Sequence, residues 1–263
     1  MVKIKPFKAI RPAQEYVRDV ASLPYDVLNT AEAREMGIHN EKSFLHIDKS
    51  EIDLAKESSP YAEEVYQKAA SNLKYFLQKD WLVQDDEEQF YLYQLTMNGR
   101  SQIGLVVCAS IKDYQEKIIK KHEFTREEKE VDRIRHVDAA DANTSPIFLT
   151  YRDQESIDTL IEQWVTENDP IYDFSSFHAV EHKVWIIDQK VIIAQLKNVF
   201  EKNVTELYIA DGHHRTESAV KVALKRKESH PDAPEDAEFN YFLAVLFPAS
   251  QLAILDYNRV VNG

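Results

Sequence analysis

The residues from Leu207 to Arg215, LYIADGHHR, carry the strongest chemical signal in this sequence. An apolar run typical of a β-strand meets Gly212, one of only five glycines, and a helix-like segment then opens with two histidines and an arginine. The free N–H groups and positive dipole end of a helix N-terminus attract anions, and phosphate is the usual one. Because basic residues gain nothing from the dipole at that end, a bound anion explains them better than helix stability does.

The side chains of this segment suggest separate roles in a phosphate site. The turn at Gly212 would hold the phosphate together with His213, His214 and Arg215, and Arg215 suits a bidentate contact. Adjacent histidines on a helix point about 100° apart, so His213 and His214 are not expected to chelate one metal together. Asp211 is interpreted either as the helix N-cap or as a ligand of a divalent metal beside the phosphates. The alternative for the whole segment is a tight strand-to-helix turn whose polar residues face solvent.

A densely charged segment, KHEFTREEKEVDRIRH, covers residues 121–136. If Thr125 caps a helix there, one helix face carries, at spacings of three and four, Arg126, Lys129, Glu130, Arg133 and His136. The composition favours a solvated helix laced with ion pairs. The functional alternative is a charged wall of an active site, with His122 and Glu123 as catalytic candidates. These two residues do not form the zinc-protease pattern, because the third residue after Glu123 is Arg126 rather than histidine.

A third segment, Pro24-Tyr25-Asp26-Val27, reads as a turn or an extended stretch. Asp26 is one of the few carboxylates outside the surface-like helices, and loops that follow strands often carry catalytic groups. A turn-forming aspartate is the commoner role for this residue type. Asp26 and Glu123 are therefore both candidates for the carboxylate that accepts a substrate proton.

Periodicity and turn signals predict a mixture of strands and helices, and hence an α+β or mixed α/β fold. Strand-like stretches cover residues 3–10, 43–48, 89–97, 100–111, 146–151, 183–187, 205–210, 239–247 and 252–257. Helical patterns cover residues 12–22, 30–36, 60–79, 154–167, 190–202 and 213–227. The Asn98-Gly99 dipeptide between two strand-like runs predicts a β-hairpin.

The bulk properties narrow the class of protein. A length of 263 residues suits one large domain, with two subdomains at about 1–115 and 116–263 as the alternative. The mean hydropathy of -0.47 and the lack of a long apolar run argue against a membrane span. The single Cys108 suits a reducing cytoplasm, and the net charge of -13 argues against a general nucleic-acid surface. The apolar run close to residue 263 suggests that a C-terminal portion is missing.

Three segments together resemble a known family. They are PFKAIRP at residues 6–12 leading to PYDV at 24–27, the stretch from His122 to His136, and DGHHR at 211–215. This combination is similar to the bacterial and archaeal family of domain of unknown function 1015, over essentially the whole chain. Members of that family usually continue well past the position of residue 263, and the family implies no settled activity.

The resemblance also implies a distant relation to ParB nucleotide-binding domains, sulfiredoxins and ParB-like free-serine kinases. These proteins share a strand, a Gly-x-x-Arg turn and a helix that hold nucleotide phosphates, and Gly212 and Arg215 match that turn. The sulfiredoxin cysteine would fall at His213 or His214, so sulfiredoxin chemistry is not expected. The acidic charge and the lack of basic DNA-binding helices argue against ParB-like DNA binding.

The leading hypothesis is a cytoplasmic, nucleotide-binding or phosphate-binding enzyme with a ParB/sulfiredoxin-like core. Its expected activity is phosphoryl transfer from ATP or ADP, with Mg²⁺, to a small hydroxyl compound such as serine. Two alternatives remain: a nucleotide-binding regulatory protein without turnover, and a metal-dependent phosphoester hydrolase. The P-loop, dinucleotide-binding and nucleophile-elbow motifs are all absent from the sequence.

Overall fold

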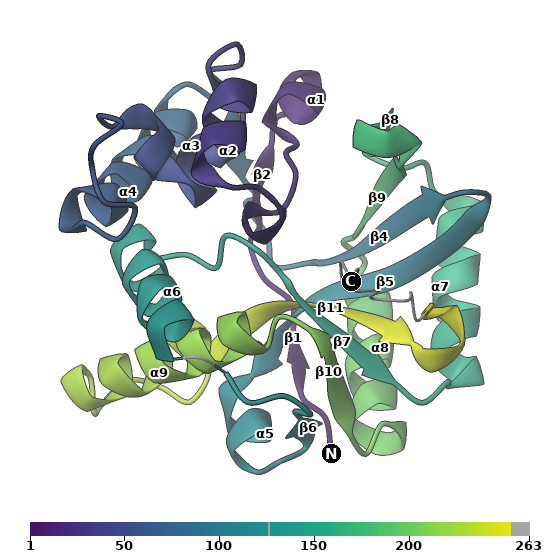
Figure 1. Cartoon of the computed structure of the whole chain (residues 1–263). Coiled ribbons are helices and arrows are strands. Elements are labelled where there is room, and N and C mark those ends of the chain that lie inside the picture. The colour runs from purple at the N-terminus through teal and green to yellow at the C-terminus, as the bar shows by residue number, and fades with distance from the viewer. Residues whose placement is uncertain (126, 254–263) are drawn as a thin grey trace, which may run out of the picture.

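The computed structural model describes residues 1–125 and 127–253. Within them the chain forms a mixed nine-stranded sheet with helices around it, so the expected α+β class is confirmed (Figure 1). Arg126, most of the expected strand over residues 252–257 and the apolar end of the chain lie outside the described residues. No helix among the described residues is long and apolar enough to cross a membrane.

The main sheet has the order β6-β10-β7-β11-β5-β4-β9-β8, and β1 pairs with β5 beside this path. Its strands are β1 Ile4–Lys5, β4 Phe90–Met97, β5 Arg100–Ser110, β6 Ile119–Lys120, β7 Ile147–Tyr151, β8 Tyr172–Ser175, β9 Glu181–Ile187, β10 Leu207–Asp211 and β11 Tyr241–Pro248. The pairs β6–β10 and β7–β11 are parallel, and the other pairs are antiparallel. One sheet therefore runs across the position near residue 115 where the sequence suggested two subdomains, and that division stays a prediction.

The hairpin predicted at Asn98-Gly99 is confirmed. Strands β4 and β5 pair in register from Tyr91 with Val106 to Met97 with Arg100. Asn98 and Gly99 both have positive φ, 53° and 77°, as the tight turn between two right-twisted strands requires.

Four longer helices pack against the sheet or against each other beside it. They are α6 Glu127–Ala140, α7 Glu155–Glu167, α8 Lys190–Asn203 and α9 His213–Ser229, and a short helix α5 covers Ile111–Gln115. Helices α7 and α8 lie side by side, and α6 packs against α9 at the other end of the sheet (Figure 1). Side chains of α7, α8 and α9 share one large hydrophobic core with the strands.

The N-terminal part of the chain forms a helical lobe above the sheet (Figure 1). Its elements are α1 Val17–Val20, η2 Tyr25–Val27, α2 Thr30–Gly37, α3 Leu45–Asp48, η3 Ser50–Asp53 and α4 Glu63–Gln78, flanked by the paired strands β2 Ile10–Pro12 and β3 Leu82–Gln84. The lobe has its own core, in which Ile47, Phe76 and Trp81 pack with Ala140 of α6. Helix α6 therefore lies between α4 of the lobe and α9.

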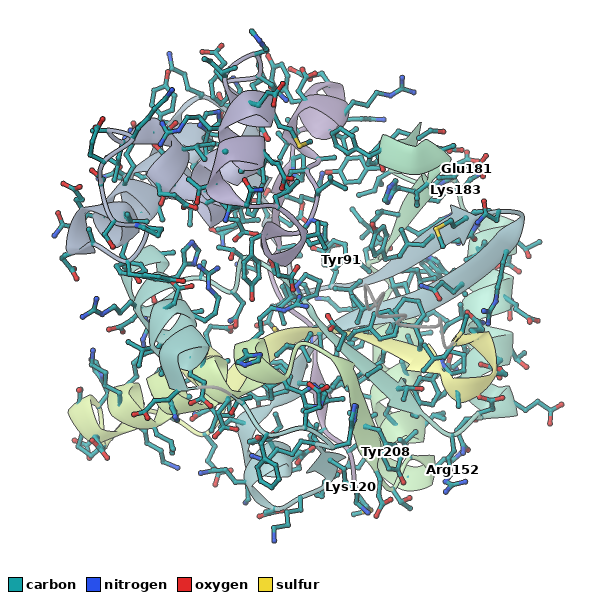
Figure 2. All side chains as sticks on the ribbon, viewed as in Figure 1. Tyr91, Lys120, Arg152, Glu181, Lys183 and Tyr208 are labelled. Atoms are coloured by element: carbon teal, nitrogen blue, oxygen red, sulfur yellow. The ribbon has the colours of Figure 1, made fainter. Side chains whose placement is uncertain are left out.

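Arg11 ties the small β2–β3 sheet to the main sheet. Its guanidinium binds the Asp85 carboxylate, with Nε to Oδ2 at 2.9 Å and Nη2 to Oδ1 at 2.8 Å. Tyr91 of β4, labelled near the centre of Figure 2, donates to the same carboxylate at 2.6 Å. Arg11 also donates to the Tyr172 hydroxyl at 2.9 Å. Arg11, the arginine of the PFKAIRP segment, is therefore held by structural contacts with Asp85 and Tyr172.

Several expected elements differ from the observed ones. The strand expected over residues 43–48 is wrong, because Leu45–Asp48 form helix α3. Such a short apolar run does not distinguish helix from strand, and packing against α4 decides it. Helix α2 begins at Thr30, where the helical pattern over residues 30–36 begins, and Asn29 caps it in a capping box with Glu32. Strand β8 was not predicted, although its alternation of buried Tyr172 and Phe174 is a strand signal.

Replacing Gly104 by alanine should weaken the centre of the sheet. A Cβ at Gly104 would lie 2.5 Å from Val245 Cγ1 and 2.8 Å from Phe247 Cζ, both on the neighbouring strand β11. We expect Gly104→Ala to lower the free energy of unfolding by about 1–3 kcal/mol, measured by urea denaturation. The control Gln102→Ala, half-buried on the same strand, should change it by less than about 0.5 kcal/mol. Equal stability of the two variants would contradict this packing.

Candidate functional site

The turn between β10 and α9 has the predicted strand-glycine-helix geometry. β10 ends at Asp211, Gly212 occupies the N-cap position with φ 94° and ψ 31°, and α9 begins at His213. The N-cap interpretation of Asp211 is therefore wrong, and no side chain caps this helix start. A Cβ at Gly212 would lie 3.2–3.4 Å from guanidinium atoms of Arg215, so that side chain folds back over the glycine. Both the left-handed backbone and this close approach favour glycine.

Arg215 is held by two oxygen atoms. Nη1 donates to the carbonyl oxygen of Pro146, and Nη2 donates to Oδ2 of Asp211, both at 2.5 Å. The Arg215 side chain is 18% exposed, whereas that of Asp211 is 70% exposed. An ion pair open to water on the carboxylate side contributes only about 0–1 kcal/mol, so another anion could replace that carboxylate at small cost.

Three sequence segments meet beside Arg215. Tyr25, Arg133, His136 and Arg215 line one cavity of about 20 Å³, together with the loop that precedes β7. The Arg133 guanidinium carbon lies 4.3 Å from the centre of the Tyr25 ring, a cation–π contact. The structure thus places residues of the 24–27, 121–136 and 211–215 segments together. The space between them holds about one water molecule.

Acidic residues surround Arg133 on two sides. Its Nε and Nη2 each lie 2.9 Å from Oδ2 of Asp132. Burial by itself would lower the pKa of Arg133, but the charges of Asp132 and Asp48 outweigh it and raise that pKa. Asp48 in turn accepts hydrogen bonds from the hydroxyls of Thr144 at 2.6 Å and Ser145 at 3.1 Å. Asp48 therefore fixes the loop whose next residue, Pro146, holds Arg215.

His136 of α6 is buried and lines the same small cavity as Arg133. It donates from Nε2 to the carbonyl oxygen of Ile47 at 2.9 Å, which joins α6 to α3. Burial and the positive charge of Arg133 lower the pKa of His136. Because its Nε2 atom is hydrogen-bonded to a backbone carbonyl, that atom is not available to a ligand. The side chain instead holds α6 in place against α3.

A second group, at the start of α9, contains His213, His122 and Glu123. The His213 side chain is only 5% exposed, and its Nδ1 lies 3.7 Å from Oε2 of Glu123. The rings of His213 and His122 meet edge to face with centroids 4.5 Å apart. Burial and His122 lower the pKa of His213, and the charge of Glu123 opposes them. The His213 Nε2 atom is buried and has no hydrogen-bond partner among the described residues, which suits an acid–base role.

Glu130 fastens α6 to α9. Its carboxylate accepts from the Thr125 hydroxyl and from Lys221, and its backbone oxygen accepts from the Ser218 hydroxyl at 3.3 Å. Burial would raise the pKa of Glu130, but Lys221 and Thr125 outweigh it and lower that pKa. His214 adds a smaller interaction of the same sign. Glu130 is thus a structural link between α6 and α9.

Three predicted residues remain, which are Asp26, Lys129 and Arg126. Asp26 is exposed on η2, next in the chain to Tyr25, and no hydrogen bond joins it to the described residues of the Gly212 turn. Lys129 belongs to α6, and Arg126 lies outside the described residues. Sequence reasoning missed Asp48, because nothing in its local pattern points to the loop that it binds, 96 residues away along the chain.

A separate basic group lies at the opposite end of β10. Figure 2 shows Lys120, Tyr208 and Arg152 near one another there. Lys120 pairs with Glu206, and Tyr208 donates to the same carboxylate at 2.6 Å. Glu206 thus offsets one of the two positive charges, those of Lys120 and Arg152, at this end of the strand.

The described residues contain no group of three or more histidine, cysteine, aspartate or glutamate side chains arranged to hold a metal ion. Mg²⁺ commonly binds through one or two carboxylates together with substrate phosphates, so it does not need such a group. The exposed Asp211 carboxylate fits that kind of partial protein site.

A family model described as a protein of unknown function (DUF1015) matches residues 4–263, a range that includes all three motif segments. The chain belongs to the DUF1015 family. Neither the curated proteins nor the solved structures include a significant match to it. The family expected from the three DUF1015-like segments is thereby confirmed.

The lowered pKa of His213 predicts how this DUF1015 protein responds to acid. Because the folded pKa lies below the unfolded value of about 6.5, His213 contributes stability above that pH and loses it as the pH falls below it. The free energy of unfolding, measured by urea denaturation, should therefore fall more for the native protein than for His213→Gln as the pH is lowered from 7 to 5.

His46 provides the opposite control. Burial would lower the pKa of His46, but the hydrogen bond that its Nδ1 donates to Asp53 Oδ1 at 2.7 Å, with the charge of that carboxylate, outweighs burial and raises the pKa. Its contribution is present below about pH 6.5 and is lost as the pH rises through the folded pKa. As the pH falls from 7 to 5, the free energy of unfolding of the native protein should therefore rise relative to that of His46→Gln. The same trend for both variants would contradict the His213 assignment.

Proposed function

We propose that this DUF1015 protein binds phosphate groups at the start of α9 and is an ATP- or ADP-dependent phosphotransferase acting on a small hydroxyl compound such as serine. One observation carries the proposal: two arginines from distant segments, Arg133 and Arg215, line the same cavity beside the uncapped helix start at Gly212. Two guanidinium groups beside the N-terminus of a helix suit phosphate.

Binding would exchange one anion for another. A phosphate oxygen would take the place of the Asp211 carboxylate at Arg215, which keeps its contact with the carbonyl of Pro146. A guanidinium has five N–H donors, so these contacts leave donors for further phosphate oxygens. The Asp211 carboxylate, once released, would be free to bind Mg²⁺ attached to the phosphates, and the ion would supply positive charge to the transferring group.

The chemical step would move the terminal phosphoryl group from the nucleotide to the hydroxyl oxygen of the acceptor. The bond from that phosphorus to the bridging oxygen breaks, and the hydroxyl proton passes to a protein base. Glu123 and His213 support this role best, because a carboxylate lies 3.7 Å from a buried imidazole at the helix start. Asp26 is the second candidate base, from the exposed turn next to Tyr25.

The Gly-x-x-Arg pattern of Gly212 and Arg215 also supports the proposal by its similarity to ParB-like nucleotide-binding turns. That similarity rests on a strand that ends at glycine and a helix that begins one residue later. It concerns the phosphate contact and implies nothing about DNA.

Replacing Arg215 by alanine should weaken phosphate binding much more than it weakens the fold. We expect ATP, ADP or phosphoserine with Mg²⁺ to raise the melting temperature of the native protein by mass action. Arg215→Ala should lose about 10- to 100-fold in affinity, since hydrogen bonds to charged groups contribute about 1.5–3 kcal/mol. Its melting temperature without ligand should stay nearly unchanged.

Lys225→Ala is the matched control for that experiment. Lys225 also pairs with an aspartate, Asp138, at 2.5 Å, but lies ten residues further along α9, about 15 Å from Arg215 along the axis. It should bind the ligands like the native protein. Unfolding of Arg215→Ala would make the arginine structural, and unchanged affinity would refute the proposed site. Binding without turnover would indicate a regulatory protein, and Mg²⁺-dependent transfer to water would indicate a phosphoester hydrolase.

Glu123→Gln should lower kcat by about 10²- to 10⁴-fold with little change in nucleotide affinity, because it removes the proposed base and keeps the side-chain shape. Rates of nucleotide-dependent phosphorylation of serine, with Kd values from calorimetry, would measure this. Asp26→Asn tests the second carboxylate in the same assay, and Glu116→Gln, exposed at the end of α5, should keep full activity. If only Asp26→Asn loses activity, Asp26 rather than Glu123 is the base.

A further inference from the structure

A larger cavity of about 500 Å³ lies next to the small arginine-lined one. Helices α6 and α9 form one side, and strands β5 and β11 with the chain after β1 form the other. Its apolar and aromatic walls include Phe7, Cys108, Val222, Phe239, Tyr241 and Leu243. The volume lies within the range of about 300–1,000 Å³ usual for small-molecule sites.

The two cavities are adjacent along α9. Val137 and Asn143 line both of them. Arg215, at the small cavity, and Ala219 and Ala223, at the large one, follow each other at intervals of four residues and so share one helix face. From Arg215 to Ala223 the helix rises about 12 Å. A single elongated ligand could therefore contact the arginine at one end and the small side chains at the other.

Charged side chains also line the larger cavity, and most of them are paired, with Lys8 and Glu88 at its exposed edge. Arg226, on its wall, pairs with Asp138 at 3.6 Å and also with Asp141. Lys5, behind Tyr241, pairs with Glu238. The exposed Asn143, at the junction of the two cavities, carries an amide that can donate and accept hydrogen bonds. The site therefore suits an uncharged ring, joined to an anionic group by a linker that can hydrogen-bond to Asn143.

We propose that the larger cavity binds the planar ring of a nucleoside phosphate whose phosphates lie at Arg215. This inference rests on the proposed function and adds the place of the nucleotide ring: the ring lies in the larger cavity, which an inorganic polyphosphate held at Arg215 would leave empty. Small alanines on α9 and aromatic side chains opposite them leave a space that a flat ring can occupy.

Cys108 provides a probe in the native protein, because it is the only cysteine in the chain and it lines this cavity. Burial raises the pKa of its thiol to about 12, so little of the reactive thiolate is present at neutral pH. Alkylation of Cys108 by a small neutral thiol-reactive compound should therefore be slow but measurable. ATP at ten times its Kd should slow that reaction by about tenfold, since about one site in eleven stays empty. Tripolyphosphate at ten times its own Kd should leave the rate nearly unchanged.

A cavity-filling variant tests the same point by affinity. The native protein should bind ATP at least about tenfold more tightly than tripolyphosphate, in calorimetry with Mg²⁺. Leu243→Trp places a large side chain in the cavity and should abolish that preference, while tripolyphosphate still binds. Leu95→Trp, half-buried on β4 and outside both cavities, is the matched control and should keep the preference.

The outcomes separate this inference from the function on which it rests. Equal affinity for ATP and tripolyphosphate, with Cys108 unprotected by either, would overturn the ring site and leave phosphate binding at Arg215 in place. Failure of both ligands to bind would overturn the proposed function as well. Protection of Cys108 by ATP would support the ring site even if Leu243→Trp does not fold.

Discussion

The buried guanidinium of Arg133 is the constraint on which the arrangement of this protein depends. An arginine does not give up its charge, so the fold must keep compensating groups beside it. Tyr25 stacks on it from the helical lobe, Asp132 pairs with it on α6, and the charge of Asp48 on α3 raises its pKa. The lobe and α6 are therefore joined at this point by electrostatic contacts as well as by their hydrophobic core.

Polar contacts also connect Asp48, beside Arg133, to the glycine turn at Gly212. Asp48 binds the hydroxyls of Thr144 and Ser145, and the next carbonyl, that of Pro146, holds Arg215 above Gly212. Each link uses a short side chain or the backbone, which leaves little conformational freedom to lose when a ligand binds. Arg133 and Arg215 are thus each held beside a carboxylate, that of Asp132 and that of Asp211.

The buried polar residues of α6 and α9 differ in how their side chains are hydrogen-bonded. His136 and Glu130 are committed to Ile47 and Lys221, and so they hold α6 in place. His213 differs, because it is equally buried but has a ring nitrogen without a partner among the described residues. A buried polar atom left unpaired costs free energy, and such a cost is commonly associated with a functional site.

Local patterns by themselves determined the elements that need only neighbouring residues. The Asn98-Gly99 hairpin, the amphipathic helices and the strand-glycine-helix turn at Gly212 follow from backbone preferences and from periodicity over short windows, and the structure has them. The family could also be predicted, because its three motifs are visible as sequence.

Tertiary structure alone decided what those elements bring together. The helical form of Leu45–Asp48 depends on packing against α4, and the contact of Asp48 with Thr144 joins residues 96 positions apart. The contact of His213 with Glu123, the burial of the His213 Nε2 atom and the cavity along α9 likewise depend on which faces the core buries. Long-range burial and charge compensation set these features, and no local window of sequence contains both partners.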